Sequence, residues 1–97
     1  MLFVTFWKMA GGVEISKVAE AAKKLFEQGK YPVKGVKVHH WLMTPGGKGI
    51  VVSEADDIEA IFKNWMVWTK EYPGIFESHE IHPAMDVPKL AELALRE

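Results

Sequence analysis

The sequence predicts an α+β fold in which strands and helices follow the order β-α-β-β-α-β, with one further helix at the end. Three observations predict it. β-branched and aromatic runs mark the strands, apolar residues at helical spacing mark the helices, and a Pro-Gly-Gly turn joins two of the strands. The chain has 97 residues, which is enough for one compact domain, so we expect residues 1–97 to form a single domain.

The first strand and the first helix take up the N-terminal third of the chain. The run LFVTFWK predicts a strand over residues 2–8, and the following AGG ends it. From Val13 to Gln28, apolar residues recur at helical spacing with charged residues between them. Gly29 comes next, at the position where a glycine with positive φ commonly ends a helix.

A hairpin is expected to follow, with TPGGK as its turn, because Pro45 fixes φ and Gly46 can adopt a positive φ. GIVVSE forms the third strand after this turn. Alternation divides the side chains of the second strand, VKVHHWLM, into two sets: Val36, Val38, His40 and Leu42 on one face, and Lys37, His39, Trp41 and Met43 on the other.

The C-terminal half contributes a helix, a strand and a short helix. Asp56 is the expected N-cap of the second helix, with Glu59 three residues later as a variant capping box. A fourth strand is expected within IFESHEIHP, and Asp86 begins a terminal helix over about residues 86–96. The order of elements is that of the ferredoxin-like fold, with two helices on one face of a four-stranded antiparallel sheet. Right-handed crossovers then predict the spatial strand order four, one, three, two.

One face of this sheet is left without a helix, yet alternation predicts that it is apolar. Its expected side chains are Phe3, Thr5 and Trp7 from the first strand, His39, Trp41 and Met43 from the second, and Val51 and Ser53 from the third. An exposed aromatic patch of this kind is unusual on a monomer. We therefore expect a second copy of the sheet to cover it by two-fold symmetry. The terminal helix is the alternative cover, although about ten residues would shield only part of the surface.

Three segments carry a resemblance to a known family: GVKVHHW, then GGKG, then SEADD ahead of a Trp-containing helix. In these segments the chain resembles the DUF3303 family of small uncharacterised proteins, over roughly residues 1–86. The turn of Gly46, Gly47, Lys48 and Gly49, and the helix start with Glu54, Asp56 and Asp57, are its main signals. The resemblance implies a dimeric α/β barrel, in which the sheets of two chains pair. It supplies no reaction and no histidine role, because members often have Arg-Trp-His where this chain has His40, Trp41 and Leu42.

Metal binding is the first chemistry that the histidines suggest. Adjacent residues on a strand point to opposite faces, so His39 and His40 cannot easily share one ion. His39 and His82 would lie on opposite edges of the sheet, roughly 14 Å apart, whereas zinc needs ligand nitrogens about 2 Å away. No metal site and no cofactor are therefore expected within one chain, and a metal site would need two chains.

Two functions remain open. In the first, a small, mostly apolar molecule binds between the paired sheets, with His39 as polar handle and acid–base catalyst. Its lining, or the interface itself, would include Thr5, Trp7, Trp41, Met43, Ser53 and Glu80. Whether Glu80 points inward depends on the phase of the fourth strand, which the sequence leaves open. In the second function, the protein is a non-enzymatic assembly or interaction protein whose lumen is filled by side chains. The choice between enzyme and non-enzyme stays open.

Composition excludes several other classes. The chain has no cysteine, which excludes disulfides, thiolate zinc sites and Fe–S clusters. A formal net charge of −1 with mixed signs argues against a nucleic-acid partner. No apolar run approaches the roughly 20 residues of a membrane span, and the N-terminus lacks the pattern of a signal peptide. We expect a cytoplasmic protein without a membrane partner.

Overall fold

The computed structural model describes residues 1–96. Its elements are β1 (Leu2–Met9), α1 (Ile15–Glu27), β2 (Val36–Met43), β3 (Lys48–Ala55), α2 (Ile58–Glu71), β4 (Phe76–Ala84) and α3 (Val87–Arg96). Glu97, the last residue of the expected domain, lies outside the described residues. The strands form one antiparallel sheet in the order β2-β3-β1-β4. The ferredoxin-like topology and its strand order are therefore confirmed.

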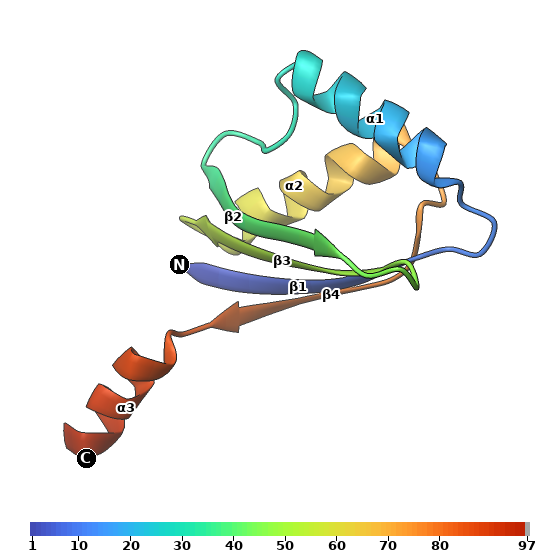
Figure 1. Cartoon of the computed structure of the whole chain (residues 1–97). Helices are drawn as coiled ribbons and strands as arrows, with labels where there is room; N and C mark the ends of the chain where they lie inside the picture. Colours follow the sequence, from blue (N-terminus) through green and yellow to red (C-terminus); the bar gives the residue numbers. More distant parts are fainter. Residues whose placement is uncertain (97) are drawn as a thin grey trace.

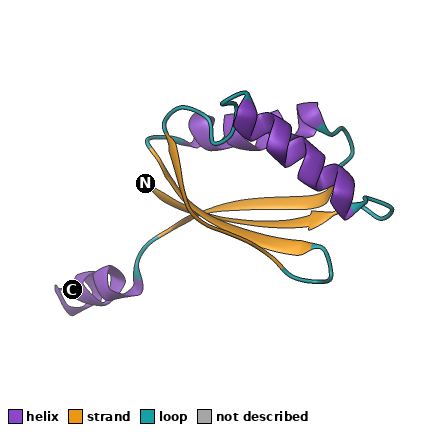
Figure 2. Cartoon of the chain, turned by 45° about the horizontal axis from the view of Figure 1, so that its top comes forward, coloured by secondary structure: helices purple, strands orange, loops and turns teal. Residues whose placement is uncertain are grey.

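The helices are distributed over both sides of this sheet. α1 and α2 cover one face, whereas α3 stands beyond the end of β4 on the opposite side (Figures 1 and 2). None of the residues of α3 is buried. We call the face of the sheet that α1 and α2 leave uncovered the open face.

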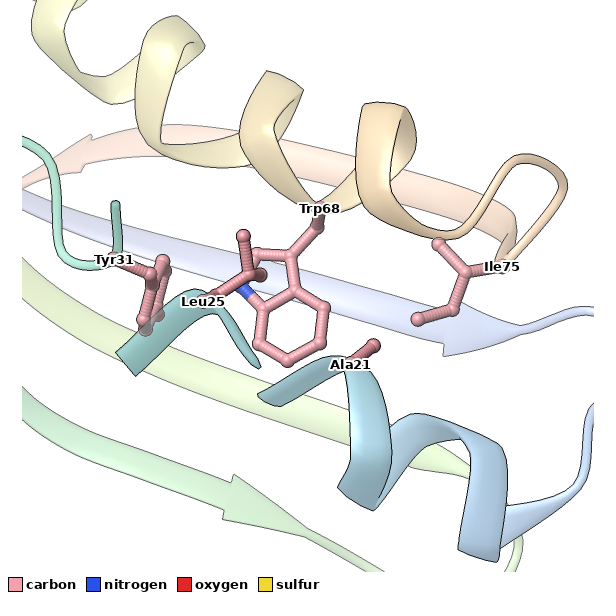
Figure 3. Close-up of a cluster of buried hydrophobic side chains, with 5 residues drawn as sticks. All are labelled: Ala21, Leu25, Tyr31, Trp68 and Ile75. Atoms are coloured by element: carbon pink, nitrogen blue, oxygen red, sulfur yellow. The ribbon is translucent and has the colours of Figure 1, made fainter. Parts of the chain in front are cut away.

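The core lies between the helix-covered face of the sheet and α1 and α2. Its largest cluster joins Ala21 and Leu25 of α1 to Tyr31, Trp68 and Ile75. Figure 3 shows Trp68 reaching from α2 into the middle of this cluster. Two further buried clusters contain side chains of β1 and β3: Phe3 with Ala55 and Ile61, and Trp7 with Met9 and Val51.

The two faces of the sheet are the reverse of those expected. The expectation that Phe3, Thr5, Trp7, Val51 and Ser53 lie on the open face was wrong, because all five are buried on the helix side. The physical reason is that β1 and β3 carry apolar residues on both faces, so alternation identifies the strands without indicating which side meets the core. The open face is nevertheless apolar, with Val4, Phe6, Ile50 and Val52 at its centre.

β2 departs from simple alternation at His39. Val38 pairs with Ser53 and His40 pairs with Val52, so His39 has no counterpart in β3. An extra residue of this kind is a β-bulge, which shifts the phase of the strand by one. Val38 and Trp41 therefore both pack on the helix side. The expected grouping of His39 with Trp41 on one face was wrong.

The ends of α1 and α2 show local capping. Gly29, with φ of 65°, directly follows the C-cap of α1, as expected. At the start of α2, however, Asp57 is the N-cap, and its Oδ1 accepts a hydrogen bond of 2.9 Å from the Ala60 N–H. The expectation of Asp56 was wrong by one residue, because either aspartate could supply the capping oxygen and only the backbone path distinguishes them.

Candidate functional site

A cavity of about 60 Å³ lies between the helix-covered face of the sheet and α2. All four strands contribute lining residues, and α2 contributes Ile61, Asn64, Trp65 and Trp68. Most of the lining is apolar or aromatic, with a few polar groups among it. That composition is typical of small-molecule sites, so this cavity is the candidate functional site.

Three aromatic rings form one wall of the cavity. The ring centroids of Tyr31 and Trp41 lie 5.2 Å apart, those of Tyr31 and Trp68 lie 5.5 Å apart, and those of Trp41 and Trp68 lie 5.4 Å apart. Edge-on and tilted aromatic pairs stabilise each other by about 0.5–1.5 kcal/mol beyond the area they bury. The three rings therefore hold one another in place, with Trp41 as the member nearest to solvent.

β4 supplies the histidine of the cavity. His79 pairs with Trp7 in the β1–β4 ladder, and its ring centroid lies 5.1 Å from that of Trp65 and 5.3 Å from that of Phe76. Burial among these rings lowers the pKa of His79 from 6.5 to about 4. The imidazole is therefore neutral near pH 7, where it offers one N–H donor and one lone pair.

Four further polar side chains are buried at or beside the cavity. Thr5 and Ser53 bring two hydroxyl groups from β1 and β3. Asn64 is held in place because its Oδ1 accepts a hydrogen bond of 2.9 Å from the Val33 N–H. Burial raises the pKa of the Tyr31 phenol, while hydrogen bonds from the side chains of Asn64 and Trp68 oppose that rise. The phenol is neutral under ordinary conditions.

Trp65 carries an unsatisfied donor. Within residues 1–96, its buried indole N–H has no hydrogen-bond partner. Leaving a buried donor unpaired costs about 1–3 kcal/mol. Trp65 is also one of the residues that line the cavity.

The structure places six of the seven predicted site residues at one of two sites. Thr5, Trp7, Trp41 and Ser53 meet in the helix-side cavity. Met43 and Glu80 instead line a groove of about 880 Å³ that includes Phe6 and Leu42 of the open face. The phase of β4 is thereby settled, since Glu80 pairs with the exposed Phe6 and His79 with the buried Trp7.

His39 lies at neither the cavity nor the groove. Its Nε2 forms a hydrogen bond of 2.7 Å with Oε1 of Glu54, a neighbour on the open-face side of β3. This contact lowers the pKa of the Glu54 carboxyl group. The structure therefore gives His39 a carboxylate partner at the edge of the open face.

Asn64, Trp65 and His79 are residues of the cavity that sequence analysis did not select. A usable signal existed for Asn64, because a polar residue three positions after Ile61 and four before Trp68 occupies the apolar stripe of α2. For His79, the signal was its alternation with Ile75 and Ile81, both of which line the cavity. Nothing in the sequence distinguishes the Trp65 N–H from that of any other tryptophan.

Between Met1 and Arg96, no group of three or more His, Asp or Glu side chains is arranged to hold a metal ion. The same part of the chain has no helix that is both long enough and apolar enough to cross a membrane.

Several solved structures share the fold. The 5-chloro-2-hydroxyhydroquinone dehydrochlorinase TftG of Burkholderia phenoliruptrix AC1100, in complex with 2,5-dihydroxybenzoquinone, is similar with a TM-score of 0.59 and 19% identity, covering 92% of this chain and 98% of that one. Protein Atu4242 of Agrobacterium tumefaciens has a TM-score of 0.56 and 8% identity, covering 90% and 96%. A NIPSNAP domain protein of Burkholderia xenovorans has a TM-score of 0.50 and 13% identity, covering 90% and 97%. At these identities the likeness shows the fold alone.

Sequence comparison gives the family. No curated protein matches the chain. Residues 1–96 match a domain of unknown function, DUF3303, which confirms the resemblance to this family. The chain therefore belongs to the DUF3303 family.

Proposed function

We propose that the protein binds a small, mostly apolar ring molecule in the cavity between α2 and the sheet. One observation carries the proposal: an aromatic-walled cavity is lined by Trp65, whose buried indole N–H has no partner within residues 1–96. A purely structural core would be expected to pair or omit this donor. The site differs from the one expected between paired sheets, because it lies within a single chain.

The volume limits the ligand. A water molecule needs roughly 10–15 Å³ of such space, and a dry engineered cavity of about 150 Å³ binds benzene. A cavity of about 60 Å³ therefore accepts at most one ring, and only if its wall shifts. Trp41 is the side chain best placed to shift, because it is 38% exposed although it packs against Trp68.

The polar groups indicate the chemistry of the ligand. The Trp65 N–H requires an acceptor, and the neutral imidazole of His79 can receive a proton or a hydrogen bond from a hydroxyl group. A phenol or hydroquinone carries both functions on one ring. The similar structure of TftG holds 2,5-dihydroxybenzoquinone, a single oxygenated ring, which supports this ligand class. We assign the proton-accepting role to His79 in place of His39.

Binding of phenol, catechol and hydroquinone, followed by quenching of tryptophan fluorescence and by calorimetry, tests this function. We expect saturable binding that weakens about 10-fold in Trp65→Phe, since this change keeps an aromatic ring at position 65 and removes the N–H donor and its hydrogen bond. Phe62→Leu is the matched control, because Phe62 is exposed on the same helix and lies outside the cavity. Equal affinity in wild type and Trp65→Phe would refute the assignment. If wild type binds none of the three probes, the interaction role becomes the better explanation.

We also propose that the chain forms a homodimer through the open face. Phe6 and Leu42 are 44% and 59% exposed there, and Ile50 of β3, the ladder partner of both, lies between them. Contiguous apolar patches of this kind mark interaction sites. Phe6→Glu should convert a dimer to a monomer in sedimentation velocity, whereas Met66→Glu, at an equally exposed site on α2, should not. A dimer in both variants would show that another surface mediates assembly.

A further inference from the structure

α3 is an amphipathic helix whose apolar side is unburied. Val87 is 73% exposed and Leu90 is 54% exposed, and no residue of the helix is buried. Its charged residues Lys89, Glu92 and Arg96 gather on the opposite side, where Arg96 donates a hydrogen bond of 2.9 Å to Glu92. The helix therefore has a clear apolar side without a surface to bury it.

Such a helix needs a partner to persist. Isolated helices shorter than about 12–15 residues are marginal in water, and α3 has 10 residues. The body of its own chain does not supply the partner, since α3 stands clear of it (Figure 1). The radius of gyration, 15.0 Å, exceeds the roughly 12.5 Å of a compact domain of this length, which reflects the same projection.

The position of α3 indicates where the partner lies. β4 is an edge strand, and only Met85 and Asp86 separate its end from α3. The helix projects to the side of the sheet opposite α1 and α2 (Figures 1 and 2). A molecule packed on the open face would therefore lie beside α3.

We propose that α3 is an exchanged arm that packs against a second copy of this chain at the margin of the open face. The proposal rests on the homodimer proposed above and extends it. In a two-fold dimer each chain extends one arm and receives the other, so both apolar helix sides become buried at once.

The area available supports this arrangement. Four strands of eight or nine residues present a face of about 19 by 26 Å, or roughly 500 Å². Stable interfaces bury about 800 Å² on each partner, so the sheets alone fall short. An arm about 15 Å long and 10 Å across covers roughly 150 Å². Each chain gains this contact twice, once where its own arm packs on the partner and once where the partner's arm packs on it. The two arm contacts and the sheet face together bury about 800 Å² on each chain.

Charge favours a protein partner over a lipid surface. Helices that lie on membranes carry an excess of Lys and Arg on their polar side. The polar side of α3 has two basic residues and one acidic residue, and the acidic one is paired with Arg96. With a net charge of only +1, and with Glu92 paired to one of its two basic residues, this polar side suits the rim of a protein interface better than a lipid surface.

A double variant, Leu90→Glu with Leu93→Glu, tests the arm by sedimentation velocity over a range of protein concentrations. We expect its dimer dissociation constant to rise at least 100-fold, while near-UV circular dichroism of the body stays unchanged. The control, Lys89→Ala with Glu92→Ala, alters the charged side of α3 and should leave the constant within about twofold. An unchanged constant in Leu90→Glu with Leu93→Glu overturns the arm.

Two results separate failure of the arm from failure of the dimer. If Phe6→Glu dissociates the dimer and the Leu90 and Leu93 variant does not, only the arm is wrong. If wild type is monomeric at every concentration, the homodimer fails and the arm fails with it. Isotope-filtered NOE spectra of mixed labelled and unlabelled chains then identify the contact: interchain NOEs from the Leu90 and Leu93 methyl groups support the arm, and exclusively intrachain NOEs overturn it.

Discussion

The indole ring of Trp7 covers Gly49, its direct partner on the neighbouring strand. A β-carbon at position 49 would overlap this ring and would lie 2.6 Å from the carbonyl oxygen of Leu42. Trp7 is also a wall of the cavity. The last glycine of the GGKG segment is therefore required by the packing of the site as well as by the hairpin.

Gly49→Ala should displace Trp7 and destabilise the protein by about 2 kcal/mol, in the range of overpacked cores. Urea unfolding followed by tryptophan fluorescence measures this cost. Gly46→Ala is the matched control, because a β-carbon there meets nothing within 4 Å. Equal stability of the two variants would show that Trp7 can move without cost.

The N-cap of α2 gives a second prediction. Asp57→Ala removes the oxygen that accepts the Ala60 N–H and should cost about 1 kcal/mol. Asp56→Ala should change the free energy of unfolding by less than half as much, because Asp56 is exposed and does not cap the helix. Thermal unfolding of both variants measures these losses. A larger loss of stability in Asp56→Ala than in Asp57→Ala would contradict the assignment of Asp57 as the N-cap.

Asn64 links α2 to the segment before β2. Asn64→Ala leaves the Val33 N–H without its acceptor, so we expect a loss of about 1–3 kcal/mol. Asn64→Asp keeps an acceptor oxygen at this position and should retain the Val33 hydrogen bond, which hydrogen exchange at the Val33 amide can detect. Equally fast exchange at Val33 in Asn64→Ala and wild type would show that this bond contributes nothing to local stability.

His79 predicts a pH dependence of stability. Its pKa of about 4 in the folded protein lies below the 6.5 of an exposed histidine, so between these values the unfolded chain binds more protons than the folded one. The stabilising contribution is therefore complete above pH 6.5 and is lost as the pH falls toward 4. Because the ring is partly exposed, we expect a loss of about 1 kcal/mol from pH 7 to pH 5 after allowing for solvent screening.

His79→Leu provides the comparison for this pH effect. Its free energy of unfolding should fall less than that of wild type between pH 7 and pH 5, since it lacks the titrating group. Urea titrations at both pH values measure the difference. Parallel losses in the two proteins would mean that other groups account for the acid sensitivity.

The topology was accessible to sequence analysis because local signals determine it. Helical periodicity, the turn around Pro45 and Gly46, and Gly29 at the end of α1 each depend on short segments. The order of strands then follows from the handedness of crossovers. These rules require no knowledge of which side of the sheet is buried.

The face of the sheet was not accessible in the same way. Phe3 and Val4 are adjacent and both apolar, as are Phe6 and Trp7, so either phase of β1 satisfies the hydrophobic pattern. The bulge at His39 adds a second ambiguity, because its extra residue leaves no mark in the composition of β2. The structure brings Thr5, Trp7, Trp41 and Ser53 to one cavity, because residues paired across neighbouring strands share a face whichever side is buried. Their neighbours on α2 could not be identified from the sequence.

The confinement of the cavity to one chain has a consequence for stoichiometry. A pocket formed between paired sheets would straddle the symmetry axis and would disappear on dissociation. Here the cavity lies between α2 and the helix-covered face of the sheet, away from the open face, so ligand should saturate at one molecule per chain in any state of assembly. Binding curves should then show no dependence on protein concentration and no cooperativity, and a monomeric variant should titrate with the same affinity as the wild-type protein.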